Sequence, residues 1–504
     1  MNERKIGILI SYLNIVLHAV IGFAYVPILL HFIGKSEYGL YQLIGSFIAY
    51  FSIMDFGLTA AVVRFYAKYK ALQDRVNMEN ILAIAMRAYG VITALMLVSG
   101  IAFYFYLPSI FAKSMTVAEI KSAKQLFILL LFNIVVTIST MIFRAVINAH
   151  EKFLFLKGLE TIQLVLQPLL VVLVLQKLPS AMAVAGVQTV LNVALIAARM
   201  YYCFQKLHIK IHYHYWDAEL FADFKKLALS VFAVTLIDQV FFKTNQVILG
   251  IVSGTVAVAV YSVASLIYMN YMALSTAISG VYLPHITEMI AQQVPVSKLS
   301  DLFIRIGRLQ FFLLALVASG FVIFGKQFIK MWAGESFVDA YFITLLIIIP
   351  FTIDLIQNIG LSIMQAQNRY DFRAKVYCAM GILNLVLAIP LALKYGGIGC
   401  AFATGLAMFL GNGLIMNWYY VKVTGLDITR FWREIGKICA VVVVISILGN
   451  IIYNMFIISE SKLIFGLSIL VYSSIYLIVL YITVMNQDEK DKITSIIKRI
   501  GIIN

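Results

Sequence analysis

Polar and charged side chains recur at helical spacing inside segments that are apolar enough to cross a bilayer. Segment 124–147 is the clearest case, because an arginine, an asparagine and several hydroxyl residues stand among leucines and isoleucines. With about 100° between successive residues of an α-helix, its polar residues fall within about 80° of one another: Asn133, Thr137, Thr140, Arg144 and, just beyond it, Asn148. This spacing predicts a single polar stripe.

A second stripe of the same kind lies in segment 340–365. Its polar residues spread over about 140° of a helix: Asp354, Gln357, Asn358, Ser362 and Gln365. When the numbering is shifted by 217, three members of the first stripe correspond to three members of the second, beginning with Thr137 and Asp354. Two matching parts of the chain are therefore expected to aim equivalent polar faces.

Ionisable and amide residues in other apolar segments extend this pattern. A charge at the middle of a bilayer costs at least about 2.5–3.5 kcal/mol on insertion scales, so such residues normally face a bundle interior or a water-filled cavity. We predict a polar cavity whose substrate-binding candidates are Arg144, Lys243, Arg64, Arg87, Asn133, Thr137, Thr140, Asn148, Gln357, Asn358, Gln365 and His18. Three carboxylates are candidates for coupling to a proton or a sodium ion: Asp55, Asp238 and Asp354. No metal and no other cofactor is expected.

The basic residues of this set indicate which substrate the cavity suits. The planar guanidinium of arginine can bind two phosphate oxygens at once, and it stays charged in a low-dielectric site. A cleft that holds Arg144 and Lys243, with Arg64 and Arg87 near its inner mouth, therefore favours an anionic head group.

Simpler interpretations of the same residues stay open at this point. Serine, threonine and asparagine in membrane helices often only bond to a neighbouring helix, at about 0.6 kcal/mol each. Asp238 and Lys243 are spaced to form an ion pair that fixes packing, and an arginine near a membrane boundary can extend to the lipid headgroups. The alignment of Arg144 with its stripe favours the cavity.

The composition places the chain in the membrane. It has 504 residues, of which 62% are hydrophobic and 12% charged, whereas soluble domains are about 45–50% apolar. Apolar runs of helical length recur along the chain, and the fold class predicted is an all-α polytopic membrane protein. We expect fourteen spans at 9–31, 40–63, 82–107, 124–147, 154–175, 181–204, 226–251, 257–283, 305–325, 340–365, 374–393, 397–421, 435–457 and 462–484.

The distribution of lysine and arginine predicts the orientation. Most of these residues fall in the two termini and the loops of one side, which the positive-inside rule assigns to the cytoplasm. Both termini are thus expected in the cytoplasm. This bias also accounts for much of the net charge of +15 without a nucleic-acid partner. The loops of the other side are short, which leaves no room for the external catalytic loop of a polysaccharide polymerase or ligase.

The chain also matches itself when its numbering is shifted by 217 or by 220. At 220, Gly34 falls on Gly254 and Tyr41 on Tyr261, and at 217 "NAHEKF" falls on "QAQNRY". These matches predict an N-lobe of spans 1–6 (1–210), a C-lobe of spans 7–12 (211–425), and spans 13–14 with a cytoplasmic tail (426–504). Such duplicated bundles are typical of secondary transporters that alternate access between the two sides. The chain contains no P-loop and no hydrolase motif, so we expect a transporter and not an enzyme.

The stretch "YVPILLHFIGKSEYGLYQLIGSFIAYFSIMDFGLTAAVVRF" (25–65) resembles the opening of the Wzx-type polysaccharide flippases, which belong to the MATE-like MOP exporter superfamily. The matching motifs are a proline-to-"YGLY" turn and "DFGL" followed by an arginine, here Asp55 and Arg64. "GGIGCAFATGLA" (396–407) is similar to the start of their twelfth span. The resemblance implies translocation of a polyprenyl-diphosphate-linked oligosaccharide across the inner membrane of a bacterial cell, for lipopolysaccharide or another surface polysaccharide. Membrane lipids and polysaccharide polymerase or assembly proteins are the partners it implies.

Two related functions remain as alternatives. A lipid II flippase shares the architecture and a cationic cleft. A MATE-type multidrug or cation antiporter would favour carboxylates over arginines in its cavity, and the in-span basic residues argue against it. The identity of the glycan, the coupling ion and the oligomeric state are left open by the sequence.

Overall fold

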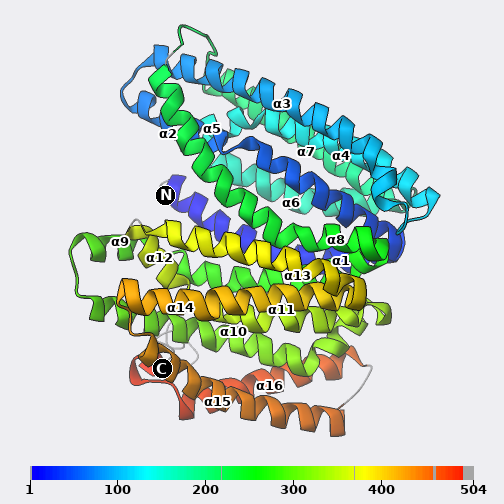
Figure 1. The fold of residues 1–504 in the computed structure, drawn as a ribbon, viewed down its shortest axis with the longest axis vertical. Helices are drawn as coiled ribbons and strands as arrows, with labels where there is room; N and C mark the ends of the chain where they lie inside the picture. Colours follow the sequence, from blue (N-terminus) through cyan, green and yellow to red (C-terminus); the bar gives the residue numbers. More distant parts are fainter. Residues whose placement is uncertain (1–2, 217, 368, 458–460, 492–504) are drawn as a thin grey trace. The chain divides into compact units, whose positions relative to one another are not determined.

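The computed structural model describes residues 3–216, 218–367, 369–457 and 461–491, and within these ranges the protein is built of helices without strands (Figure 1). Eleven helical stretches are long and apolar enough to cross a membrane. Three of them contain a glycine with non-helical angles, where the chain passes from one span to the next: Gly34, Gly254 and Gly396. Counting each such stretch as two spans brings the number to fourteen, and the predicted fold class is confirmed.

The elements of the first half are α1 (Glu3–Ser52), η1 (Ile53–Asp55), α2 (Leu58–Ala71), α3 (Arg75–Phe111), α4 (Val117–Ser139), α5 (Met141–Ala149), α6 (Phe153–Leu175), α7 (Ala181–Tyr201) and η2 (Tyr202–Lys206). Then follow α8 (Ala218–Ser279), α9 (Leu283–Ala291), α10 (Val296–Trp332), η3 (Glu335–Phe337), α11 (Asp339–Leu355) and α12 (Asn358–Ala366). The chain continues with α13 (Tyr370–Met408), η4 (Phe409–Ile415), α14 (Met416–Tyr419), η5 (Tyr420–Thr424), α15 (Ile428–Ile452), η6 (Tyr453–Ile457) and α16 (Lys462–Thr483).

The helices group into two compact units. Unit 1 consists of Met1–Leu266 and Gly381–Ala403, and unit 2 of Ile267–Met380 and Thr404–Asn504. Inside each unit the long helices run alongside one another (Figure 1). These units follow packing and not the repeat, so the lobes expected at 1–210, 211–425 and 426–504 stay a prediction, and most of the expected tail lies outside the described residues.

Backbone geometry repeats at the shift found in the sequence. Gly34 and Gly254, which correspond at the shift of 220, share the same left-handed φ, at 72° and 80°. The same shift relates Gln73 and Gln293, whose φ angles are 56° and 53°. A positive φ is uncommon for any residue other than glycine, so its recurrence at two matching positions supports duplication of one helical unit.

Helix breaks and ring contacts repeat as well, at a shift of 217. The α4–α5 break at Thr140 (φ −108°, ψ 5°) corresponds to the α11–α12 break at Gln357 (φ −105°, ψ 9°). A stacked pair of rings 4.0 Å apart joins α6 to η2 in unit 1, and its counterpart, also 4.0 Å apart, joins α13 to α14 in unit 2: Phe155 with Tyr202, and Phe372 with Tyr419. The duplication therefore extends to side-chain packing.

Hydroxyl side chains explain the break between α4 and α5. Thr137, Ser139 and Thr140 each donate a hydrogen bond to the carbonyl four residues earlier, at 2.6–2.7 Å. Bonds of this kind compete with the backbone ladder and bend helices. The chain therefore bends between α4 and α5, and Arg144 lies on α5, beyond the bend.

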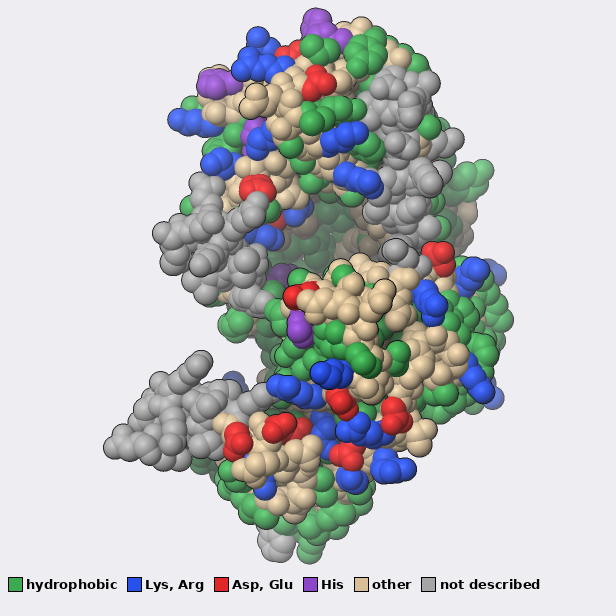
Figure 2. All heavy atoms as spheres, turned by 90° about the vertical axis from the view of Figure 1, so that its left-hand side faces the viewer, with side chains coloured by type: hydrophobic (Ala, Val, Ile, Leu, Met, Phe, Trp, Pro, Cys, Tyr) green, Lys and Arg blue, Asp and Glu red, His purple; other side chains and the backbone are tan. Residues whose placement is uncertain are grey.

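Basic side chains gather on one face of each unit. In unit 1, Lys and Arg side chains are frequent at the end that carries the α2–α3 turn, and in unit 2 at the end that carries the α9–α10 turn (Figure 2). Eleven stretches able to span a bilayer make this a multi-pass membrane protein. The cytoplasmic assignment of this face remains a prediction of the positive-inside rule.

Gly405 allows span 12 to approach α11 closely, and this contact can be tested. A Cβ at Gly405 would lie 2.3 Å from the carbonyl oxygen of Leu346, whereas one at Gly436 in α15 would meet nothing within 4 Å. We expect Gly405→Ala to lower the free energy of unfolding by about 1–3 kcal/mol through overpacking. Gly436→Ala should be neutral or stabilise by about 0.5–1 kcal/mol, since alanine favours the helix.

Thermal unfolding of both variants in detergent measures this difference. Equal melting temperatures for Gly405→Ala and Gly436→Ala would contradict the close approach of the two backbones.

Candidate functional site

The arginine of the first polar stripe forms an ion pair between two helices of unit 1. Arg144 on α5 places Nη2 2.8 Å from Oε1 of Glu160 on α6. The second carboxylate oxygen of Glu160 accepts from Nζ of Lys157, also at 2.8 Å and one helical turn away. Both oxygens of a single carboxylate are thus held by cations, while the Arg144 side chain stays 45% exposed.

A third cation approaches the same carboxylate. Arg199 on α7 is half-buried and interacts electrostatically with Arg144 and Glu160. Its Nε is buried and has no acceptor within the part of the chain that the structure describes. The cluster therefore combines three positive charges with one negative charge, an excess that suits an anionic ligand.

A pocket lies beside this cluster, between α1 and α6. Its volume is 370 Å³, and its lining is mostly amide and imidazole: Asn14, His18, Glu160, Gln163, Leu164 and Gln167. Asn14 fixes the two helices together, since its Oδ1 accepts from Thr161 at 2.7 Å. Such a size falls in the usual range of about 300–1,000 Å³ for ligand sites. The amides and His18 in the lining can hydrogen-bond to ligand hydroxyl groups, and the cationic cluster adjoins the pocket through Glu160.

The upper part of the predicted stripe has a different environment. Asn133 is buried, and its Nδ2 donates to Thr189 at 3.1 Å. Asn192 on α7 donates to Asn133 Oδ1 and to Thr137 Oγ1, both at 2.6 Å. These bonds tie α4 to α7, so the structure places Asn133 and Thr137 in a helix contact and separates them from Arg144 at the Thr140 break.

The other predicted residues of unit 1 do not join the Arg144 cluster through any described contact. Arg64 is exposed. Arg87 on α3 lies 3.7 Å from the ring centre of Tyr213, which belongs to the segment after η2. Asn148 is exposed and Lys243 is half-buried on α8. The side chain of Asp238 lies outside the described residues. Among this group, His18 alone lines the pocket beside Glu160.

Asp55 lies in the short η1 turn that interrupts span 2. Its Oδ1 accepts hydrogen bonds from Thr59 at 2.9 Å and from the hydroxyl of Tyr89 on α3 at 3.0 Å. Phe56 and Gly57, which follow it, both have left-handed φ angles of 49° and 72°. The "DFGL" motif thus forms a defined break in a span, with its carboxylate hydrogen-bonded to hydroxyl groups.

The second stripe is enclosed in unit 2. Asp354 on α11 is 8% exposed and pairs with Arg373 on α13 at 3.4 Å, and Arg373 also donates to Asn412. Gln357 is buried and donates to Asn417 at 2.9 Å. Two further candidates differ in exposure, since Asn358 donates to Ser275 at 3.1 Å and Gln365 is exposed.

Sequence reasoning missed the partners of both stripes. Glu160 is the sole carboxylate in segment 154–175, and Lys157 stands three residues before it at helical spacing. That signal, an in-span carboxylate beside a basic residue, was available. Arg199 and Arg373 lie near the ends of their spans, where a basic residue usually extends to the headgroups, and only the tertiary packing reveals their partners.

No group of three or more metal-ligating side chains occurs among the described residues. In the loop after η2, His214 lies 3.1 Å from Glu79 on α3. Cys203 and Cys400 are buried, Cys378 and Cys439 are exposed, and all four are free thiols.

Residues 5–290 match the family model described as polysaccharide biosynthesis protein, which covers more than half of the chain. The chain belongs to this family. No curated protein sequence matches it. The resemblance to polysaccharide flippases expected from residues 25–65 is therefore confirmed at the level of the family.

Solved structures share the fold. The lipid II flippase MurJ in an inward closed conformation is similar with a TM-score of 0.71 and 16% identity, covering 95% of this chain and 99% of MurJ. An inward-facing multidrug resistance MATE family transporter of the MOP superfamily has a TM-score of 0.62 and 13% identity, covering 82% and 96%. A MOP superfamily transporter from Pyrococcus furiosus has a TM-score of 0.53 and 13% identity, covering 84% and 97%. This family member thus has the fold of MOP transporters.

The Asp354–Arg373 pair makes a testable prediction about unit 2. Removing one partner of a buried ion pair leaves an uncompensated charge and typically destabilises by about 3–5 kcal/mol. We expect Arg373→Met to lower the melting temperature in detergent strongly, and Arg373→Met combined with Asp354→Asn to recover part of the loss.

The exposed Arg369 gives a control, and Arg369→Met should leave the melting temperature almost unchanged. A double variant no more stable than Arg373→Met alone would argue against charge compensation as the role of the pair.

Proposed function

We propose that the protein translocates a polyprenyl-diphosphate-linked oligosaccharide across the bacterial cytoplasmic membrane by alternating access, for biosynthesis of a cell-surface polysaccharide. The observation that carries this proposal is the cationic cluster of Arg144, Lys157 and Arg199 around a single carboxylate, next to a pocket rich in amides. Membership of the polysaccharide biosynthesis family supports it independently.

The chemistry of such a substrate matches the cluster. A diphosphate carries negative charge and many acceptor oxygens, which a guanidinium binds in pairs. In the absence of substrate, Glu160 compensates the charges of Arg144 and Lys157. A diphosphate arriving at the cluster replaces the carboxylate as the partner of Arg144, while amides of the pocket and His18 bond to sugar hydroxyls. The polyprenyl chain remains in the lipid.

Alternating access also needs an end of the bundle that can close. In unit 1, Ser36 on α1 donates to Glu119 at 2.7 Å, and Thr255 on α8 donates to the same oxygen at 2.9 Å. Gly39 lies so close to α8 that a Cβ there would be 1.9 Å from the carbonyl oxygen of Thr255. We assign this contact of spans 2 and 8 as the external gate, which must separate to release the substrate outside.

The remaining expectations are part of the same proposal. The protein acts without a catalytic step, and both termini lie in the cytoplasm. Coupling to protons or sodium ions would use the carboxylates Asp55, Asp238 and Asp354. Among these, Asp55 suits the role better than Asp354, because Arg373 already compensates the charge of Asp354. Polysaccharide polymerase or assembly proteins would receive the product at the outer face.

Lipid II transport is the second candidate, since a polyprenyl diphosphate is common to both substrates and the cationic cluster suits either. Export of organic cations fits poorly, because three basic residues around one carboxylate repel a cationic drug. A deletion strain separates these functions. Our proposal predicts that undecaprenyl-diphosphate oligosaccharide accumulates at the cytoplasmic face, whereas unchanged glycans with new dye sensitivity would indicate drug export.

Arg144 is the residue that tests the role of the cluster. We expect Arg144→Ala to abolish export in the deletion strain while the protein inserts normally, because the diphosphate loses its bidentate donor. Arg144→Lys should be partly active, since it retains the charge without the planar fork. Accumulated lipid-linked oligosaccharide and surface polysaccharide are the two measurements.

Lys177→Ala, which removes an exposed lysine after α6, is the matched control and should export normally. Wild-type export by well-expressed Arg144→Ala would refute the assigned role.

Gly39 tests the external gate. Gly39→Ala places a methyl group against the backbone of α8, so we expect it to favour the state with this contact open. In a background without the native cysteines, Ser46→Cys introduces a thiol at a buried position. This thiol should react faster with a membrane-impermeant reagent when Gly39→Ala is also present.

Gly45→Ala is the control on the same span, since a Cβ there meets nothing within 4 Å. Identical labelling rates in Gly39→Ala and Gly45→Ala would exclude gating at this contact.

A further inference from the structure

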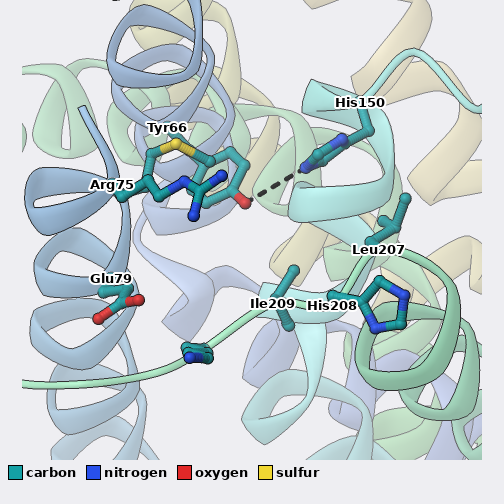
Figure 3. Close-up of a pocket in the computed structure, with 9 residues that line it drawn as sticks. Tyr66, Arg75, Glu79, His150, Leu207, His208 and Ile209 are labelled. Carbon is teal, nitrogen blue, oxygen red and sulfur yellow. Dashed lines mark hydrogen bonds between the residues drawn. The ribbon is translucent and has the colours of Figure 1, made fainter. Parts of the chain in front are cut away.

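A second pocket in unit 1 lies at the end of the bundle that carries the α2–α3 turn. Its volume is 350 Å³. Arg75 and Glu79 enter it from α3, His150 from the end of α5, and Leu207, His208 and Ile209 from the segment after η2 (Figure 3). Lys210 also lines it. None of its lining residues belongs to the α1–α6 pocket beside Glu160.

The charged groups of this pocket are mostly basic. Arg75 and Lys210 are exposed and form no ion pair within the described ranges of the chain. The carboxylate among the lining residues, Glu79, lies 3.1 Å from His214. Among the residues that the structure describes, the pocket therefore presents two cations without an acidic partner and one acid that already has a partner.

His150 and Tyr66 form a fixed polar wall. The hydroxyl of Tyr66, a buried residue on α2, lies 3.2 Å from Nε2 of His150 (Figure 3). Burial lowers the pKa of His150 to about 4, and the positive charges of Lys70 and Lys152 act in the same direction. At neutral pH the imidazole is consequently uncharged and able to hydrogen-bond, while the two lysines contribute a positive field to this wall.

The backbone of His208 distinguishes the pocket from its counterpart in unit 2. His208 has a left-handed φ of 49°, a conformation that is strained for residues with a side chain. At the shift of 217, His208 corresponds to Gly425, with a φ of 71°, which adopts this turn without strain. Strain that is retained where a glycine would relieve it points to a role for the side chain.

Other lining residues change in the same comparison. At the shift of 217, His150 corresponds to Gln367 and Lys210 to Asp427, which caps α15 in unit 2. The turn therefore does not require basic or imidazole groups. Their presence in unit 1 is a property of the pocket and not of the fold.

We propose that this pocket binds a phosphate group, with Arg75 and Lys210 as its cationic donors and His208 as a hydrogen-bonding side chain held in place by the strained turn. The proposal does not depend on the substrate assigned above, because the pocket shares no residue with the Glu160 site. A soluble phosphorylated molecule or the headgroup of an anionic lipid supplies the same chemistry.

Binding experiments on the full-length protein in detergent distinguish these sources. The soluble probe is pyrophosphate, titrated at constant ionic strength by calorimetry. The lipid probe is phosphatidylglycerol, counted by native mass spectrometry after reconstitution and delipidation. The variant Arg75→Gln/Lys210→Gln removes both donors, and Lys68→Gln/Lys177→Gln removes two exposed lysines elsewhere for the same change in net charge.

We expect the pocket variant to lose about tenfold in affinity for one of the two probes, since a hydrogen bond to a charged group contributes about that factor or more. A loss for pyrophosphate identifies a soluble ligand, and a loss of retained phosphatidylglycerol identifies a headgroup. If neither probe separates the pocket variant from the control variant, the proposal is overturned.

His208→Gly provides a readout that a purely structural role would not produce. Glycine relieves the left-handed strain, so the melting temperature should stay equal or rise, while affinity for the same probe falls. A lower melting temperature with unchanged affinity would contradict the assignment of His208 to the ligand.

Discussion

Charge compensation inside membrane-spanning helices is the constraint on which the organisation of unit 1 depends. The span that contains Glu160 accommodates its carboxylate because Arg144 and Lys157 each lie 2.8 Å from one of its oxygens. The break at Thr140 gives α5 its own direction, and α6 supplies the carboxylate. Because Arg199 adds a further positive charge nearby, the resting cluster is overcompensated, and this surplus defines the ligand that it can accept.

The features that repeat along the chain belong to the scaffold and not to this chemistry. A shift of 217 relates helix breaks and stacked rings, and a shift of 220 relates left-handed turns. The matching elements thus share one pattern of apolar spans and turn residues. Local sequence is enough to specify them, since a glycine at a hairpin or a run of hydroxyl residues acts on its own segment.

The distinction between local sequence and tertiary packing explains how much of the structure the sequence could predict. The fourteen spans follow from apolar runs, and the polar face with Arg144 follows from helical spacing. Both signals depend only on neighbours along one helix. The separation of Asn133 and Thr137 from Arg144 does not, because it depends on Asn192 of another helix. The same holds for the pairing of Asp354 with Arg373. Helical spacing places residues on a face, and only tertiary packing decides whether that face is a helix contact or the wall of a pocket.

The comparison of the two units also supports the proposed position of the substrate site. At the shift of 217, every charged member of the cluster becomes uncharged in unit 2, where the corresponding residues are Leu361, Ala374, Tyr377 and Met416. The second stripe, in unit 2, instead contains Asp354 paired with Arg373, a neutral pair with little exposure. Since the helix breaks and the stacked rings recur at this shift without those charges, these features of the fold do not require the charges around Glu160. Ions in a membrane bundle that are not needed for folding are expected to act on a ligand, and for that reason we propose unit 1 as the place where the phosphate of the substrate binds.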